Sequence, residues 1–132
     1  MSVKLRLLAL LVFPVLLGLS SCMSNQENQL VGTWTLTRMD ALPGEYPFIQ
    51  WEFTADYDLL KYEITETENK PISTGRWGFS KRNRLNISKF DQDFNGEWQI
   101  VTFKNNVLRM VLPVVVDDHP AGQVLVEFTR SR

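Results

Sequence analysis

The dominant feature of the sequence is a two-residue alternation of apolar and polar side chains that recurs along the chain from residue 30. Threonines alternate in the first run with residues of one parity, namely Leu30, Gly32, Trp34 and Leu36. The same rhythm returns at residues 49–54, 60–65, 75–79, 84–88, 97–100, 108–112 and 123–129. Because successive side chains of a β-strand point to opposite faces, the pattern predicts eight strands that each bury one face.

The links between these runs are short and polar, which favours antiparallel neighbours. Asn105-Asn106 is a two-residue link, and asparagine tolerates the positive φ that a tight hairpin requires. An up-and-down sheet leaves two exposed edges unless it closes into a barrel. We therefore expect an all-β, eight-stranded up-and-down antiparallel barrel, with a β-sandwich as the alternative because its strands show the same alternation.

Two segments depart from the alternation. Val101 and Phe103 fall on the wrong parity for the run that begins at residue 97, which leaves residues 99–103 ambiguous. The run Val114, Val115 and Val116 is compatible with a β-bulge or with a strand buried on both faces. Beyond the N-terminal segment, no window shows the apolar stripe of an amphipathic helix.

The first 21 residues have the pattern of a secretory signal peptide, with Lys4 and Arg6 before the apolar stretch 7–17. A membrane-spanning helix needs roughly 20 apolar residues, which is more than this stretch provides. Leu-Ser-Ser-Cys at residues 19–22 resembles the lipobox of bacterial lipoproteins. The resemblance implies cleavage between Ser21 and Cys22 and acyl chains on Cys22, hence a membrane anchor.

This resemblance divides the chain into a lipoprotein signal peptide (1–21), a lipidated cysteine with a polar tether (22–29) and a barrel domain (30–132). An extended tether of seven residues, 23–29, reaches at most about 25 Å. Lipoprotein sorting in many diderm bacteria favours the inner membrane when Asp follows the lipidated cysteine. Met23 occupies that position, so we expect the outer membrane of the envelope, with the domain facing either the periplasm or the cell surface.

Composition and charge exclude several function classes. The chain has 14 Lys and Arg against 15 Asp and Glu, without a basic stripe, so we expect no nucleic-acid partner. Cys22 is the only cysteine, so no disulfide forms within the chain. His119 is the only histidine and lies in a polar turn beside two aspartates. We therefore expect no metal site, no cofactor and no enzymatic activity.

Gly32-Thr33-Trp34 at the start of the first expected strand resembles the Gly-x-Trp signature of lipocalins and related calycin barrels. The resemblance implies that Trp34 closes one end of the barrel and that a basic residue of the last strand stacks over it. Arg130 is the first candidate for this residue and Arg132 the second. The chain as a whole resembles the small lipocalin-like lipoproteins of bacterial envelopes.

The interior of an eight-stranded barrel is either filled by side chains or holds one small ligand. If it holds a hydrophobic or amphipathic ligand, the candidate pocket residues are Arg38, Trp51, Phe53, Tyr62, Trp77, Trp98 and Met110. Arg38 and Tyr62 would orient a polar head. The alternative is a non-enzymatic interaction module, an inhibitor or scaffold of an unspecified envelope protein, with a filled core and outward residues such as Tyr46, Phe48 and Leu125. An apolar cavity open at one end favours the first hypothesis.

Overall fold

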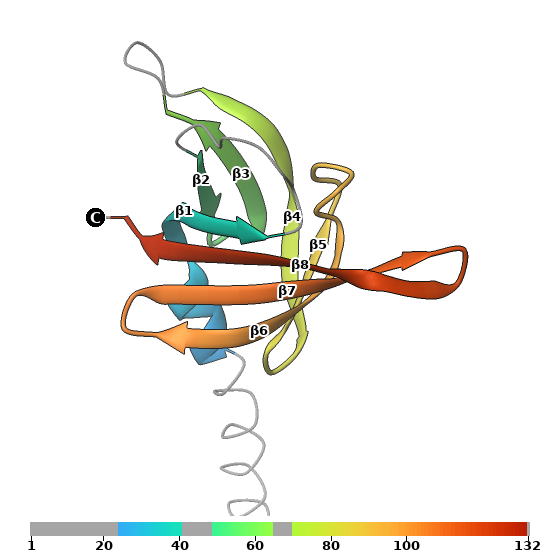
Figure 1. The fold of residues 1–132 in the computed structure, drawn as a ribbon. Helices are drawn as coiled ribbons and strands as arrows, with labels where there is room; N and C mark the ends of the chain where they lie inside the picture. Colours follow the sequence, from blue (N-terminus) through green and yellow to red (C-terminus); the bar gives the residue numbers. More distant parts are fainter. Residues whose placement is uncertain (1–23, 41–48, 65–69, 132) are drawn as a thin grey trace, which may run out of the picture.

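The computed structural model describes residues 24–40, 49–64 and 70–131, and its strands close into one antiparallel barrel in chain order (Figure 1). The last strand pairs with the first, which confirms the up-and-down barrel and removes the sandwich alternative. The strands are β1 (Gly32–Asp40), β2 (Ile49–Phe53), β3 (Asp58–Glu63), β4 (Pro71–Lys81), β5 (Arg84–Ser88), β6 (Gly96–Lys104), β7 (Val107–Val116) and β8 (His119–Arg130).

Aromatic side chains occupy much of the barrel interior. All four tryptophans of the chain are buried, and Trp51 lies at the centre of the cluster. Its ring centroid is 4.8–6.4 Å from those of five other aromatic residues, Phe53, Phe90, Phe94, Trp98 and Phe128. Several of these pairs are edge-to-face, a geometry that adds roughly 0.5–1.5 kcal/mol per pair to the burial of the rings.

Bulges change the inward parity within two strands. The register of β1 with β8 shifts between Leu36 and Arg38, so Met39 joins the residues packed against the core. The register of β6 with β7 shifts between Ile100 and Thr102, and Phe103 turns inward against Trp34 at a centroid distance of 5.9 Å. The second bulge resolves the ambiguity of residues 99–103, because an extra residue reverses the alternation that follows it.

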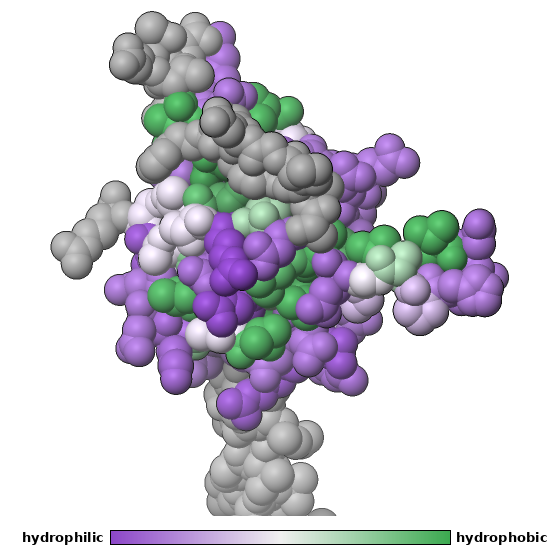
Figure 2. Space-filling model, in the orientation of Figure 1, coloured by the Kyte–Doolittle hydropathy of each residue, from purple (hydrophilic) through white to green (hydrophobic). Residues whose placement is uncertain are grey.

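The β7–β8 hairpin extends beyond the barrel (Figure 1). A register shift between Pro113 and Val115 confirms the bulge, and the alternative of a strand buried on both faces is wrong. Val115 and Val116 are 62% and 55% exposed, and the apolar surface of this projecting hairpin is visible in Figure 2. We call residues 113–122 the β7–β8 arm.

Two tight turns use left-handed backbone conformations. Asn105 and Asn106 connect β6 to β7 with φ of 54° and 63°, which confirms the predicted two-residue hairpin. Asp117 and Asp118 connect β7 to β8 with φ of 49° and 61°. Asparagine and aspartate adopt these angles more readily than other non-glycine residues, since their short polar side chains tolerate the left-handed region.

A short helix over residues 24–30 replaces most of the expected polar tether. Its Gln26 side chain donates to Asn83 Oδ1 at 2.7 Å, and Glu27 accepts from the Tyr57 hydroxyl at 3.0 Å. Leu30 is a buried residue at the end of this helix and not the beginning of β1, as its parity suggested. The expectation failed because a helix this short depends on contacts with the barrel, which local sequence does not reveal. In the part of the chain that the structure describes, no helix has the length and apolar character that membrane crossing requires.

Candidate functional site

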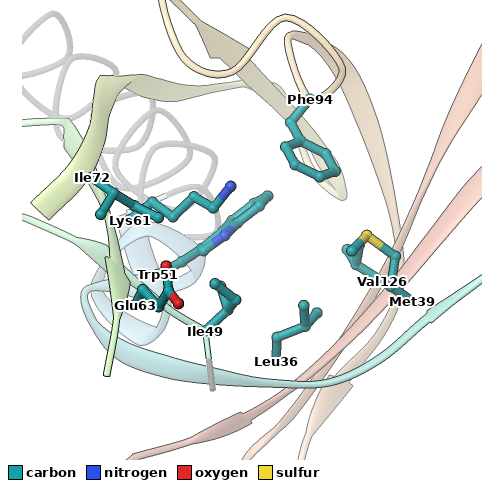
Figure 3. A pocket seen from close by; sticks show the side chains of 9 residues that line it. All are labelled: Leu36, Met39, Ile49, Trp51, Lys61, Glu63, Ile72, Phe94 and Val126. Atoms are coloured by element: carbon teal, nitrogen blue, oxygen red, sulfur yellow. The ribbon is translucent and has the colours of Figure 1, made fainter. Parts of the chain in front are cut away.

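A cavity of about 310 Å³ lies between the strand ends at one end of the barrel (Figure 3). Met39 near the end of β1, Ile49 at the start of β2 and Glu63 at the end of β3 all line it. The helix over residues 24–30 contacts the β2–β3 and β4–β5 turns, which lie at the other end of the barrel. The cavity therefore opens at the end opposite this helix. The described residues that line it are Leu36, Met39, Ile49, Trp51, Lys61, Glu63, Ile72, Phe94 and Val126.

Most of the described cavity lining is apolar and comes from strands of the barrel. The side chains of Ile49 and Trp51 alternate inward from β2, and Val126 does so from β8. Phe94 comes from the loop between β5 and β6, with its ring 5.5 Å from that of Trp51. This arrangement provides an apolar surface held by a packed aromatic cluster, which is suited to a hydrophobic molecule.

Lys61 is one of two charged residues among the described residues of the lining, and it is paired with Asp91. Its ammonium lies 2.5 Å from Asp91 Oδ2 and 5.4 Å from the centre of the Phe94 ring. The side chains of Lys61 and Asp91 are only 17% and 30% exposed. Burial alone would raise the pKa of the Asp91 carboxyl, but hydrogen bonds from Lys61 and Ser73 hold that pKa below its usual value.

Glu63 is the other charged residue of the lining. It lies two positions after Lys61 on β3, hence on the same inward face of the strand. Within residues 24–40, 49–64 and 70–131, no hydrogen bond or ion pair involves its carboxylate. The cavity thus combines a lysine that is paired with Asp91 and a carboxylate that has no partner within the described part of the chain.

The opposite end of the barrel is closed around Trp34. The Arg130 guanidinium lies 4.4 Å from the centre of the indole, the position that the resemblance implies, whereas Arg132 lies outside the described residues. Arg130 also donates to the carbonyl oxygens of Val31, at 3.3 Å, and of Gln29. A Cβ on Gly32 would lie 2.9 Å from Arg130 Nη1, and its φ of +138° further favours glycine.

Two predicted pocket residues lie outside the barrel. Arg38 is inward by strict alternation, but the β1 bulge turns it outward, where it is 57% exposed and forms an ion pair with Asp40 at 2.9 Å. The alternation predicts that Tyr62 faces inward from β3, but Leu59, Lys61 and Glu63, which have the opposite parity, face inward instead. The Tyr62 hydroxyl donates to Glu52 Oε1 at 3.2 Å on the outer face, so neither residue can orient a ligand in the cavity.

The remaining predicted pocket residues separate into two groups. Trp51 lines the cavity, whereas the others are buried in the core without lining it: Phe53, Trp77, Trp98 and Met110. The sequence does not predict Lys61 and Glu63, because the apolar residues Leu60, Tyr62 and Ile64 have the opposite parity and indicate the other face of β3 as inward. The sequence does not predict Phe94 either, because alternation carries no information about a loop. Ser21, Cys22, Tyr46 and Phe48 lie outside the described residues.

The described residues contain no group of three or more His, Cys, Asp or Glu side chains that could hold a metal ion. A comparison with curated proteins finds no significant match. A family model described as a lipocalin-like domain matches residues 30–110, which extend from the end of the N-terminal helix into β7. Together with the closed eight-stranded barrel, this match shows that the chain belongs to the lipocalin-like domain family.

Proposed function

We propose that this protein is a lipid-anchored binding protein of the bacterial envelope, which holds a small hydrophobic or amphipathic molecule in the cavity at the open end of its barrel. The observation that carries the proposal is the cavity itself, with its largely apolar lining around Trp51. Its role is binding and not catalysis: His119, the only histidine, lies on the exposed arm.

The size of the cavity limits the ligand. A volume of about 310 Å³ is near the lower end of the range for small-molecule sites, roughly 300–1,000 Å³. Burial of apolar ligand surface contributes about 25 cal/mol per Å², so one alkyl chain against Leu36, Phe94 and Val126 supplies useful affinity. The ligand is therefore a single-chain or similarly small apolar molecule whose polar end remains at the opening.

The position of Cys22 supports an orientation for the anchored domain. Only Met23 separates Cys22 from the helix over residues 24–30, and two residues span at most about 7 Å. The helix lies at the closed end of the barrel, so acyl chains on Cys22 hold that end toward the outer membrane. The cavity then opens away from the anchoring bilayer, and its ligand enters from the aqueous side.

The first test isolates the acylated protein in detergent, extracts it and identifies the bound small molecules by mass spectrometry. A stoichiometric hydrophobic compound is expected with wild-type protein but not with Met39→Trp, which fills the cavity. Val101→Trp places the same side chain on an exposed outward position of β6 and should leave the compound bound. Empty wild-type protein together with no saturable binding of decanol would overturn the proposal.

A second candidate function, a protein-interaction module, is favoured by one observation. The β7–β8 arm projects from the barrel and exposes Val115 and Val116, an arrangement that costs solubility unless a partner covers it. Crosslinking in intact cells should give a discrete adduct with the wild type and lose it in the Val115→Ser/Val116→Ser double variant. An adduct pattern identical in both proteins would remove this candidate.

A further inference from the structure

The cavity is lined by one ammonium group and one carboxylate, and they differ in whether they can bind a ligand. Among the described residues, Lys61 and Glu63 are the only charged ones that line it, and both point inward from β3 (Figure 3). In that view the Lys61 chain runs along the cavity wall toward Trp51 and Phe94. The other lining residues carry no charge, so these two side chains decide which polar head the cavity accepts.

Lys61 already forms an ion pair with Asp91 of the same chain. Its contact with Asp91 is a short charge-assisted hydrogen bond between two largely buried side chains. An anionic head at Lys61 would compete with Asp91 and place a second negative charge beside it. Displacing Asp91 would leave a partly buried carboxylate without its partner, which is strongly unfavourable.

Glu63, in contrast, has no charged partner among the described residues. Arg38, the basic residue at the end of β1, forms its ion pair with Asp40 on the outer surface instead. A ligand with an uncharged head that covers the Glu63 carboxylate removes water from it without forming an ion pair. This desolvation opposes binding. An ammonium head compensates for this loss with an ion pair, and the indole of Trp51, which lines the same cavity, offers an aromatic ring that attracts cations.

We infer that the cavity selects a cationic amphiphile, an alkyl or aryl amine whose apolar part packs on Trp51, Leu36 and Val126 while its ammonium pairs with Glu63. This inference rests on the proposed binding function and adds the chemical class of the ligand. It also explains why the one lysine in the lining is neutralised by Asp91, since a free ammonium there would repel a cationic ligand.

The test compares three probes that share one alkyl chain and differ in the head, decylamine, 1-decanol and decanoate, by calorimetric titration of the acylated protein at neutral pH. The expected order of affinity is amine, alcohol, acid, with decylamine at least fivefold tighter than decanol. The comparison uses wild-type protein, so it does not depend on the folding of any variant.

Two variants assign the selectivity to the named residues. Glu63→Gln is expected to bring decylamine affinity down to that of decanol while leaving decanol unchanged. Glu97→Gln, on the exposed face of β6, is the matched control and should retain the preference for the amine. Asp91→Asn releases Lys61 and should raise decanoate affinity severalfold, because the ammonium then becomes available.

The outcomes separate this inference from the proposed function. Saturable binding of all three probes with equal affinity would overturn the selection of a cation but retain the binding function. Tightest binding of decanoate would likewise overturn it and assign the head to Lys61. If none of the probes binds wild-type protein that mass spectrometry shows to be empty, the binding function and the inference both fail.

Discussion

Trp34 connects three parts of the chain that are distant in sequence. Its indole N–H donates to the Leu30 carbonyl oxygen at 2.8 Å, and its ring lies beneath the Arg130 guanidinium at 4.4 Å. The edge-to-face contact with Phe103 adds a third connection, to the end of β6. The N-terminal helix, the last strand and the end of β6 therefore meet at one buried side chain of β1.

Replacing Trp34 by alanine is expected to lower the free energy of unfolding by about 3–5 kcal/mol, because the buried ring leaves a cavity. Equilibrium urea denaturation measures this change, with Val101→Ala on the exposed face of β6 as the control. A loss below about 1 kcal/mol would mean that the Trp34 ring does not close the barrel.

The Lys61–Asp91 pair makes a pH-dependent contribution to stability. Because the folded protein holds the pKa of the Asp91 carboxyl below its usual value, the pair stabilises the fold at pH values above the pKa of this carboxyl in the unfolded chain. The contribution is lost as the pH falls through the folded-state pKa. Asp91→Asn should therefore cost about 1 kcal/mol at neutral pH, and denaturation curves of variant and wild type should converge in acid. A constant difference across the acid range would contradict this origin.

For single residues, the sequence predicts conformation most reliably where it depends on neighbouring residues in the chain. The positive φ of Asn105 and Asn106 follows from a two-residue link between alternating segments, and the structure confirms the turn. The inward position of Lys61 could not be predicted, because a lysine between apolar neighbours normally faces solvent. Only the pairing partner Asp91, thirty residues away, makes its inward position favourable.

The strands themselves are largely predictable from alternation, but their bulges are not. One extra residue in β1 turns Arg38 outward and Met39 inward, and the same kind of shift brings Phe103 against Trp34. A bulge depends on the register with a neighbouring strand, which the sequence of one strand does not contain. The lining of the cavity could therefore be predicted only in part, at Trp51.

The helix over residues 24–30 and the barrel stabilise each other through hydrogen bonds. Removing residues 24–29 while retaining Leu30 should lower the unfolding free energy by at least about 1 kcal/mol, since the Gln26–Asn83 and Glu27–Tyr57 hydrogen bonds and the Gln29 acceptor of Arg130 are lost. Thermal and urea denaturation of the unacylated domain measure the change.

The same deletion distinguishes a helix that stabilises the barrel from a segment that only connects the barrel to its anchor. The control is Ser24→Gly, because Ser24 is exposed and its replacement leaves the hydrogen bonds of Gln26, Glu27 and Gln29 intact. Unchanged stability of the deletion variant would show that the segment serves only to connect the domain to its anchor. The cavity lies at the other end of the barrel, so decanol affinity should be retained wherever the variant is folded.

At the scale of the whole molecule, the closed end and the open end have different tasks in our account. The closed end carries the helix, Trp34 and Arg130, and the lipid on Cys22 is proposed to lie next to it. The open end carries the cavity and its charged residues. This separation allows anchoring and binding to be altered independently.

Replacing Cys22 by alanine is therefore expected to release the protein from the membrane fraction and to abolish lipid labelling, without changing decanol affinity. The reason is that a stable anchor requires the buried methylenes of the acyl chains, each worth roughly 0.8 kcal/mol. Fractionation and metabolic labelling with a fatty-acid analogue measure both effects. Continued membrane association of the unlabelled variant would show that another segment holds the protein.

The central claim is that the open end of the barrel binds a hydrophobic molecule, and methyl NMR during a decanol titration tests it most directly. We predict saturable shifts of the methyl groups that line the cavity, those of Leu36, Met39, Ile49, Ile72 and Val126, with Val101 on the outer face unaffected. Shifts confined to the exposed Val115 and Val116 of the arm, or no saturable shift at any methyl group, would contradict the account.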